Sequence, residues 1–537
     1  MKKIKEIIIF SGIWIIPAVV IIGESFKTHF PSIHVHYGLE QEVLVGLIIV
    51  IFVLAANSLT LENGKSLAAY HLFDAFNLKQ DMYAQRHKPH SEIYPPIPDD
   101  MKFNKPTGLV LGKSNGKYIC DCLDSGSGHY LILGQSGCGK TVTLLSTLIN
   151  NQRTKEFTIF AIDVKGELHK KGTLATDASI IIIDPDDFNA WGYDPLYKIG
   201  STFTEQELIE VASEISYSLL PIISDEKNAF WTDSARSLLM ACIIYYYKQG
   251  YRDLISIFDA MSECSTEEVI DDITSGSATD SAEYRTITRF IGMAAETLSG
   301  IVGQMFSNLT VFLQDEKIRY MLGENSKKAA PTMLNSDRSI YLAIPEHKIS
   351  DYARVLHLII NQTISEMETR PEGMKRVLMV IDELPRILSA GRIEKLENAL
   401  ETLRSRCVSM VLIAQSTDAL ERAYSHAAVQ GMTVNVNKLI LSASSKDTVD
   451  NIIRWAGKYI GIRYTQSRSY RGGNSSVSYE QKNRIEPSEL ITLPLKNECI
   501  IITNNGYNRF KKIKYYEDKN LKKTYAELQK SWNELKS

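Results

Sequence analysis

The sequence has almost no net charge and few of the residues that mark metal-binding or disulfide-rich proteins. The 60 Lys and Arg residues stand against 63 Asp and Glu, a formal net charge of −3, so overall positive charge does not mark it as a nucleic-acid binder. The seven cysteines show no paired metal spacing, and Cys120-x-Cys122 is too close for a usual zinc knuckle. We find no internal repeat and no transit sequence. At 537 residues the chain is too long for one ordinary domain, so two or three folded units are expected.

Two long runs without charge stand near the start of the chain, at residues 7–23 and 43–61. At about 1.5 Å per residue they span roughly 26 and 28 Å, close to the ~30 Å core of a bilayer. No A-x-A-like cleavage site follows the first run, which argues against a signal peptide. Buried helices of a folded domain are the alternative for the second run. We predict a transmembrane hairpin over residues 1–64.

Basic residues indicate how this hairpin is oriented. The loop at residues 24–42 holds one Lys and three Glu, whereas Lys and Arg stand outside both runs. These flanking residues are Lys2, Lys3, Lys5, Lys65, Lys79, Arg86 and Lys88. Both termini are therefore predicted to be cytoplasmic. Residues 65–106 are expected to hold a juxtamembrane helix, at about 66–85, and a proline-rich linker.

A phosphate-binding loop pattern, Gly134-x-x-x-x-Gly139-Lys140-Thr141, follows an apolar strand and precedes an apolar helix. The glycines let backbone N–H groups turn toward a polyphosphate, Lys140 would lie against the β- and γ-phosphates, and Thr141 would ligate Mg²⁺. A plain glycine turn is the alternative. The predicted nucleotide-binding residues are Gly134, Gln135, Ser136, Gly137, Cys138, Gly139, Lys140 and Thr141. Cys138 within the loop implies a reducing compartment.

Apolar strands alternate with helices over much of the remaining chain, which predicts an α/β fold with a mostly parallel sheet. The strand pattern stops between residues 203 and 322, where we expect an inserted all-α domain. The predicted domains are a nucleotide-binding domain in two parts, 107–200 and 326–518, an all-α insertion at 201–325, and a basic tail at 519–537. Asp163 and Asp184 follow predicted strands and either form turns or face a ligand.

Further candidate catalytic residues follow two later strands. In Val377-Leu-Met-Val-Ile-Asp382-Glu383 an apolar strand ends in two carboxylates. Asp382 would hold Mg²⁺ through water, and Glu383 would activate the attacking water. Gln415, after the strand at 408–414, would contact the γ-phosphate. Arg404 is either a cation at a helix end or an arginine finger, which reaches a neighbouring subunit's nucleotide; its position alone favours the helix-end role.

Two other segments carry positive charge. Residues 464–479 are predicted to be a flexible basic-aromatic loop, which would contact single strands or, more simply, form the tip of a surface hairpin. Residues 509–523 hold seven Lys and Arg against two acids. A solvated surface is the default interpretation, with contact to DNA, lipid or a partner as the alternative.

The order of these motifs resembles that of type IV secretion coupling proteins, the TraG/TraD-type conjugative ATPases, which are related to the FtsK and HerA motors. The resemblance covers nearly the whole chain. Its parts are the membrane hairpin, the phosphate loop, Asp163-x-Lys-Gly-Glu167, Gly192-Tyr-Asp-Pro-Leu196, Phe230-Trp231, Ala235-Arg236, Asp382-Glu383-Leu384, Arg404, Gln415-Ser416, Arg484-Ile-Glu-Pro487 and Lys514-Tyr-Tyr-Glu-Asp518. The family often has Asn where this chain has Asp194, and the outer loop here is short.

The resemblance implies a RecA-like core that binds ATP and Mg²⁺, with the nucleotide roles given above for Lys140, Thr141, Asp382, Glu383 and Gln415. It implies Arg404 as the finger, with Arg406 as the second choice. It further implies a homo-hexamer with one nucleotide at each subunit interface, anchored by two passes in the bacterial inner membrane. The implied partners are relaxase-bound single-stranded DNA, the relaxosome and the secretion channel.

Four functional hypotheses follow. The first is an ATP-driven motor that pumps DNA to a secretion channel. The second keeps the motor but has protein effectors as cargo, and the third is a receptor that binds ATP and hardly hydrolyses it. The fourth, a chromosome pump of the FtsK kind, ranks last because the sequence shows neither its long linker nor a C-terminal helix-turn-helix pattern.

Overall fold

The computed structural model describes residues 97–123, 128–221, 229–323, 325–469, 472–504 and 506–536. Contacts divide the chain into two units, and the larger comprises residues 94–462 and 479–537. The predicted transmembrane hairpin and juxtamembrane helix lie outside the described residues. Within those residues, no helix combines the length and the apolar character needed to cross a membrane.

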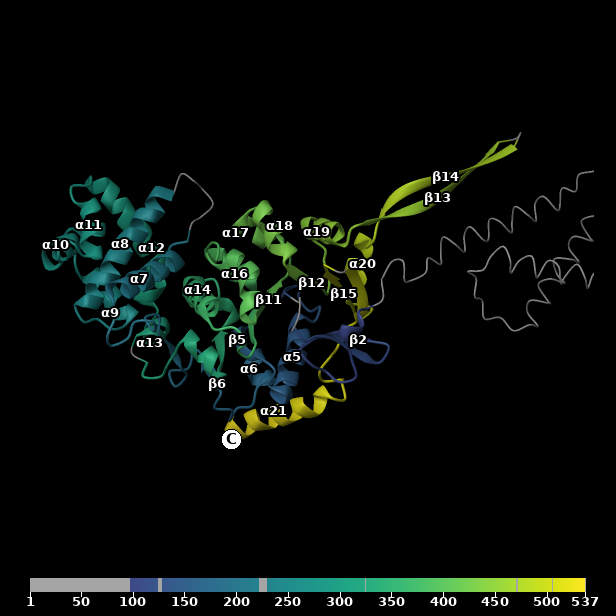
Figure 1. The fold of residues 1–537 in the computed structure, drawn as a ribbon, viewed down its shortest axis with the longest axis horizontal. Helices are drawn as coiled ribbons and strands as arrows, with labels where there is room; N and C mark the ends of the chain where they lie inside the picture. Colours follow the sequence, from purple (N-terminus) through teal and green to yellow (C-terminus); the bar gives the residue numbers. More distant parts are fainter. Residues whose placement is uncertain are drawn as a thin grey trace, which may run out of the picture. The chain divides into compact units, whose positions relative to one another are not determined.

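A twelve-stranded sheet forms the centre of the larger unit (Figure 1). In sheet order its strands are β1 (Lys102–Phe103), β3 (Lys117–Asp121), β2 (Leu109–Ser114), β16 (Gly506–Lys511), β15 (Glu498–Thr503), β12 (Val436–Ile440), β4 (His129–Leu133), β11 (Val408–Ala414), β10 (Val377–Ile381), β5 (Thr158–Val164), β9 (Ser339–Ile344) and β6 (Ile180–Ile183). Every pair from β12 to β6 is parallel. The pairs from β12 to β1 are antiparallel. The predicted α/β fold with a mostly parallel sheet is therefore confirmed.

The central strands are buried from end to end because helices cover the sheet. All residues of β4, β5, β10 and β11 are buried, as expected of parallel strands with both faces covered. Figure 1 shows α5 (Lys140–Thr154), α6 (Glu167–Gly172) and α21 (Leu521–Lys536) together along the sheet, and α21 contacts both other helices. Leu144, Leu148 and Leu528 of these helices share one buried cluster with Ile132 of β4.

Several further helices connect the later strands. They are α14 (Ala353–Thr369), α15 (Leu384–Ile387), α16 (Leu396–Thr402), α17 (Asp418–Tyr424), α18 (His426–Val434), α19 (Lys446–Ala456) and α20 (Pro487–Thr492). A 3₁₀ turn, η7 (Leu403–Arg406), precedes β11.

Seven α-helices are found among the described residues of the stretch where the strand pattern stops. They are α7 (Glu205–Leu219), α8 (Ala229–Lys248), α9 (Leu254–Glu263), α10 (Thr266–Gly276), α11 (Ala282–Ile287), α12 (Ala295–Gln314) and α13 (Glu316–Leu322). Thr204 with Glu207 and Ser265 with Glu268 form capping boxes that start α7 and α10. The short strands β7 (Gly192–Tyr193) and β8 (Lys328–Ala329) pair in parallel and bracket the helices. The chain therefore leaves and re-enters the sheet domain at one place.

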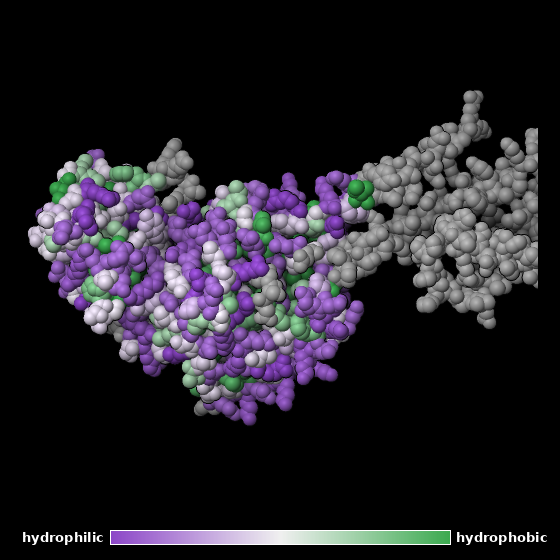
Figure 2. All heavy atoms as spheres, in the orientation of Figure 1, coloured by the Kyte–Doolittle hydropathy of each residue, from purple (hydrophilic) through white to green (hydrophobic). Residues whose placement is uncertain are grey.

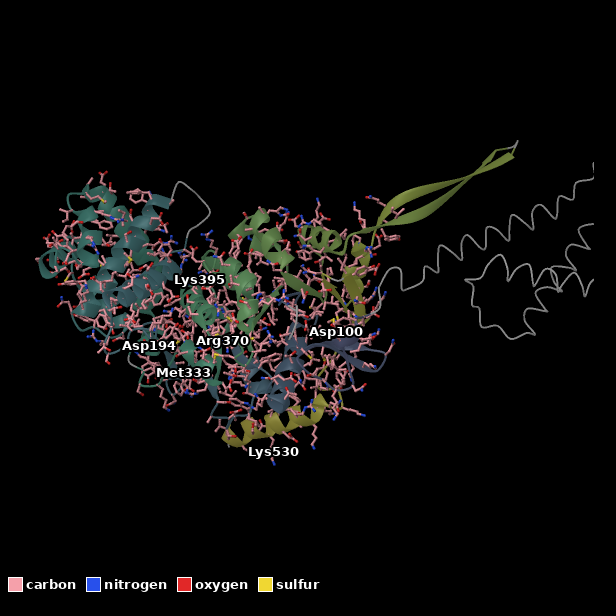
Figure 3. All side chains as sticks on the ribbon, viewed as in Figure 1. Asp100, Asp194, Met333, Arg370, Lys395 and Lys530 are labelled. Carbon is pink, nitrogen blue, oxygen red and sulfur yellow. The ribbon has the colours of Figure 1, made fainter. Side chains whose placement is uncertain are left out.

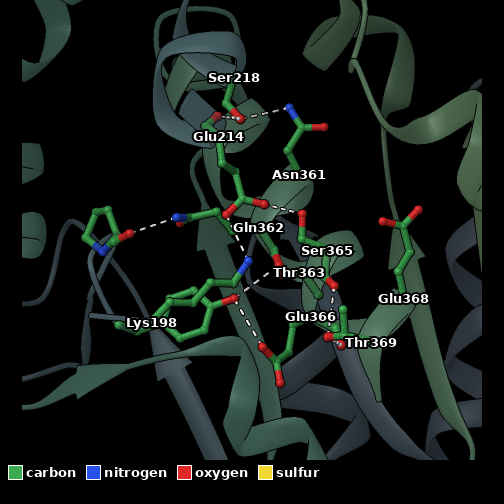
Figure 4. A network of polar contacts seen from close by, with 12 residues as sticks. Lys198, Glu214, Ser218, Asn361, Gln362, Thr363, Ser365, Glu366, Glu368 and Thr369 are labelled. Carbon is green, nitrogen blue, oxygen red and sulfur yellow. Dashed lines mark hydrogen bonds and ion pairs between the residues drawn. The ribbon is translucent and has the colours of Figure 1, made fainter. Parts of the chain in front are cut away.

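Polar contacts join α7 of this helical group to α14 of the sheet domain, near Lys395 (Figure 3). Figure 4 shows the network, in which Glu214 of α7 forms an ion pair with Lys198 at 3.0 Å and a hydrogen bond with Ser365 of α14. Asn361 donates to the Ser218 hydroxyl at 3.2 Å and accepts the backbone N–H of Lys395 at 3.2 Å. Because these groups are largely buried, the network fixes the position of α7 against α14.

Two segments near the C-terminus can be compared with their predictions. Residues 464–469 and 472–479 belong to two paired strands, β13 (Lys458–Ser469) and β14 (Gly472–Asn483), which agrees with the predicted surface hairpin rather than with a wholly flexible loop. The tail after residue 519 contains α21, whose Leu521 and Leu528 are buried. The leucine spacing gives α21 an apolar face that packs on α5 and α6, while its lysines stay on the outside.

The face of the described residues drawn in Figure 2 is mostly hydrophilic, and its hydrophobic spots are small and separate. Leu495 and Ile460, at 88% and 70% exposure, are the most exposed large apolar side chains that the structure describes. Single exposed apolar residues of this kind are normal on a folded protein.

Candidate nucleotide-binding site

The loop between β4 and α5 has the backbone that a phosphate-binding loop requires. Gly137 and Gly139 have φ angles of +77° and +101°, in the left-handed region that glycine adopts most easily. A Cβ atom on Gly134 would lie 2.3 Å from the Cys138 Sγ atom. These three glycines therefore cannot be replaced without moving the loop.

Lys140 opens α5 and its side chain folds back over this loop. Its Nζ atom donates hydrogen bonds to the carbonyl oxygens of Gly134 at 2.8 Å and Gln135 at 3.2 Å. Gln135 and Ser136 are exposed, and Thr141 is half-buried in the first turn of α5. The loop is thus open to a ligand, with the lysine ammonium held where an anion would enter.

Asp382 follows β10 and lies close to the phosphate loop. Its carboxylate is 7% exposed and accepts the backbone N–H of Glu383 at 3.0 Å. Burial, and then the charge of Glu383, raise the pKa of Asp382 to about 7, while the positive charge of Lys140 lowers it. Because β4 and β10 lie on either side of β11 and all three strands are parallel, Lys140 and Asp382 follow strands that end at the same edge of the sheet, although they are far apart in sequence.

Glu383 and Gln415 stand at the same edge of the sheet. Glu383 has a φ of +50°, which turns the chain sharply after β10. Gln415, the first residue after β11, donates from its Nε2 atom to the Glu383 Oε2 atom at 3.5 Å. Since β11 lies between β4 and β10, and the Gly134 N–H donates to the Ala414 carbonyl at 3.2 Å, Gln415 lies between the phosphate loop and the carboxylates.

Asp163 and Asp184 both form turns. Asp163 is fully buried and accepts the backbone N–H groups of Leu168 and His169 at 2.9 and 2.8 Å, which starts α6. Its negative charge also contributes to the raised pKa of Asp382. Asp184 accepts the N–H of Asp186 at 2.9 Å after β6, at the far side of the sheet. Of the two alternatives for these residues, the hydrogen bonds support the turn-forming one.

The two candidate finger arginines lie at the opposite edge of the sheet, before the amino end of β11. Arg404 is exposed, and its charge adds to the burial that lowers the pKa of His129, the first residue of β4, to about 4. Arg406 donates to the backbone carbonyl of Arg370 at 3.3 Å. Because the whole of β11 (Val408–Ala414) lies between these arginines and the edge where Ala414 bonds Gly134, neither arginine can reach the phosphate loop of its own chain.

Sequence reasoning missed three residues that shape the loop. Ser442, after β12, accepts the backbone N–H of Gln135 at 2.9 Å, and Ser444 bonds the Gln135 side chain. Lys512, after β16, donates from its Nζ atom to the Cys138 carbonyl at 2.8 Å. They carry no motif and lie hundreds of residues away in sequence. The only signal is that Ser442 follows an apolar strand, whose carboxyl end adjoins that of β4.

These residues fit a nucleotide with Mg²⁺. No group of three or more His, Cys, Asp or Glu side chains in the described part of the chain forms a ready metal site. Mg²⁺ commonly takes one or two protein ligands together with substrate phosphates and water. Thr141 can supply a direct protein ligand and Asp382 can hold the metal through water, and a cation there would compensate the buried negative charge of Asp382.

A phosphate loop and a carboxylate-bearing strand at the carboxyl edge of one parallel sheet define a RecA-like P-loop nucleotide-binding protein. The model of the family described as type IV secretory system conjugative DNA transfer matches residues 78–536. The chain belongs to this family.

Relatives and solved structures agree with this assignment. The VirD4 protein of Rhizobium rhizogenes is 21% identical over 441 residues, which cover 79% of this chain and 64% of the length of that relative. The bacterial conjugative coupling protein TrwB in its unbound form has a TM-score of 0.61 and 16% identity, covering 77% of this chain and 89% of its own. TrwB in complex with ADP and Mg²⁺ has a TM-score of 0.60 and 15% identity, covering 78% and 96%. This likeness to TrwB confirms the RecA-like fold.

Proposed function

We propose that the protein is a membrane-anchored ATPase that recruits relaxase-bound single-stranded DNA and drives it into a type IV secretion channel. The observation that carries the proposal is that the phosphate loop and Asp382 follow strands that end at the same edge of the sheet, in a chain of the conjugative DNA transfer family. The nucleotide and metal seen with TrwB support ATP and Mg²⁺ as its cofactors.

The residues at this edge each have a defined task in hydrolysis. ATP would supply the phosphoryl group, and Mg²⁺ would neutralise charge on it. The Lys140 ammonium, which is bonded here to the Gly134 and Gln135 carbonyls, would turn to the phosphate oxygens. Thr141 would hold the metal directly and Asp382 through water, and Glu383 would accept a proton from the attacking water. Gln415, in contact with Glu383, would orient that carboxylate and contact the γ-phosphate.

The quaternary and membrane parts of the proposal rest on separate observations. Arg404 is exposed at the edge of the sheet opposite the phosphate loop, so an arginine finger at this position would act on the nucleotide of a neighbouring subunit. This supports a closed ring, for which we propose a homo-hexamer with relaxosome and channel partners. The uncharged runs at 7–23 and 43–61 support a two-pass anchor in the bacterial inner membrane with both termini cytoplasmic.

The test is the ATPase rate of the detergent-solubilised full chain with single-stranded DNA, with double-stranded DNA and without DNA. We expect stimulation by DNA that falls steeply as salt rises, because phosphate contacts release counterions. Lys140→Ala should lower the rate at least about 100-fold and leave membrane insertion intact, since it removes the cation that faces the phosphates. Lys530→Ala, on the exposed side of α21, is the control and should match the wild type.

Two results would contradict the proposal. Normal turnover by Lys140→Ala would reject the site. If the ATPase rate of the wild type at low salt is the same with single-stranded DNA, with double-stranded DNA and without DNA, DNA is rejected as cargo and protein effectors are favoured.

A further inference from the structure

The C-terminal part of the chain reaches back to the phosphate loop through one side chain. Lys512 follows β16, and its Nζ atom donates to the Cys138 carbonyl at 2.8 Å. Its own backbone N–H donates to the Asn497 carbonyl at 2.9 Å, so its position is fixed by the β15–β16 pair. The side chain is half-buried, and burial lowers the pKa of Lys512.

The contact fixes the orientation of one peptide group. The Cys138 carbonyl and the Gly139 N–H belong to the same peptide unit, which is planar and trans, so the two point in opposite directions. Lys512 holds the carbonyl on one side of the loop, and the Gly139 N–H must therefore point to the other. Backbone N–H groups at this position, directly before α5, are the donors that a bound phosphate needs.

The neighbouring peptide groups have hydrogen bonds within the loop and the first turn of α5. The Cys138 N–H donates to the Gln135 carbonyl at 3.3 Å, and the Gly139 carbonyl accepts the Thr143 N–H at 3.0 Å. The peptide group between them has no β-carbon on the Gly139 side, and a glycine beside a peptide lets it rotate at low cost. Lys512 supplies the hydrogen bond to its carbonyl and so favours one orientation.

We propose that Lys512 is a positioning residue for nucleotide binding, which orients the Gly139 amide toward the phosphates by holding the Cys138 carbonyl. The inference rests on the proposed function, because it concerns the same site. Lys512 contacts no reacting atom; it acts through the loop. It also ties the loop to the strand pair β15–β16, which is the antiparallel extension of the sheet.

Other contacts hold the C-terminal segment in place without Lys512. Asp518 pairs with Lys113 and accepts from the Tyr118 hydroxyl, and Arg509 pairs with Glu489 at 2.8 Å. Removing the Lys512 ammonium should therefore change the loop and leave the fold. Lys514, which forms an exposed ion pair with Glu517 at 2.9 Å, is the matched control.

The experiment uses the full chain in detergent with fluorescent ADP and Mg²⁺ as the probe, together with kcat, KM and Tm. We expect Lys512→Met to raise the Kd for ADP and the KM for ATP about tenfold, as for loss of one charge-assisted hydrogen bond. The value of kcat should change little, because the Gly139 amide binds substrate and transition state alike. Lys512→Arg should restore most of the affinity, and Lys514→Met should match the wild type, with Tm unchanged throughout.

The other outcomes overturn the inference. Unchanged ADP binding by Lys512→Met, with normal binding by the wild type, rejects it and leaves the proposed function standing. A loss of Tm in step with the loss of affinity, with no rescue by arginine, shows a merely structural role. Should Lys512→Met not fold, Lys512→Gln and Lys512→Arg provide the same comparison, and equal Kd values for both and the wild type would reject the inference. If the wild type binds no nucleotide, the proposed function fails and the inference fails with it.

Discussion

At the scale of single residues, burial sets the behaviour of the site. Asp382 is 7% exposed at the end of β10, with Glu383 beside it and Asp163 nearby, so its ionised form is disfavoured and its pKa rises to about 7. Lys140 partly offsets this effect. A cation bound beside Asp382 would stabilise the ionised form of this carboxylate.

This burial predicts a pH-dependent stability that can be measured without nucleotide or Mg²⁺. Between pH about 4 and 7 the folded protein keeps a proton on Asp382 that the unfolded chain has released, so its contribution to stability is lost as pH rises through this window. Asp382→Asn should remove the loss, and the difference in free energy of unfolding, variant minus wild type, should grow by up to about 1.4 kcal/mol per pH unit.

Urea unfolding at pH 5, 6, 7 and 8 checks this expectation for both proteins. Parallel pH profiles would show that Asp382 titrates as an ordinary carboxyl. Asp382→Asn should also weaken the dependence of nucleotide binding on Mg²⁺, since it removes the charge that faces the metal.

At the scale of elements, the helix α21 is part of the core of the nucleotide-binding domain. Leu528 is 2% exposed and packs in the same buried cluster as α5, and the Trp532 Nε1 atom donates to the Thr173 carbonyl at 2.8 Å. Gln529 donates to the Lys170 carbonyl at 3.0 Å. The helix α21 therefore packs against α5, which starts at the phosphate loop, and against α6, whose first turn is bonded by Asp163.

The packing of α21 can be tested with two leucines of the same helix. Leu528→Ala should lower the free energy of unfolding by about 2–5 kcal/mol, because it leaves a cavity in the core. Leu535→Ala, at a position that is 63% exposed, should change it by less than about 0.5 kcal/mol. Urea unfolding of both variants makes the comparison, and equal values would mean that α21 does not pack as described.

At the scale of the whole molecule, the candidate site residues lie at two opposite edges of the sheet. The phosphate loop, Asp382, Glu383 and Gln415 gather at the carboxyl edge of the sheet, and Arg404 lies at the amino edge. An arginine at that edge can contribute to catalysis only across a subunit interface. Arg406, which donates to Arg370, is less free to do so.

Mixed rings test this arrangement. Arg404→Ala subunits doped into wild-type rings should reduce ATPase activity more than in proportion to their fraction, because each variant subunit also deprives its neighbour. The measurement is the rate against the fraction of variant at constant total protein. A strictly proportional loss would place Arg404 outside catalysis, and the same titration with Arg406→Ala then tests the second choice.

The features that the sequence alone determined are those formed by residues close together in the chain. The phosphate loop could be predicted because its glycines, Lys140 and Thr141 are contiguous, and the strand before Asp382 because an unbroken apolar run marks a buried parallel strand. Asp163 shows where this kind of prediction fails. It also follows an apolar strand, but its carboxylate accepts hydrogen bonds at the start of α6 rather than facing a ligand. For residues 464–479 the simpler alternative, the tip of a surface hairpin, agrees with the pairing of β13 with β14. The length of these strands could not be predicted, because strand pairing depends on a partner strand rather than on composition.

Only the tertiary structure decided which distant residues meet. Strand order places β4 and β10 on either side of β11, and this arrangement alone brings Asp382 to Lys140, Gln415 to Glu383 and Arg404 to the far edge. Lys512 and Ser442 reach the loop because β16 and β12 belong to the same sheet, and nothing in their own sequence marks that role. The physical reason is that a motif is recognised by its own covalent spacing, whereas a contact across a sheet is set by the packing of every strand between the two residues.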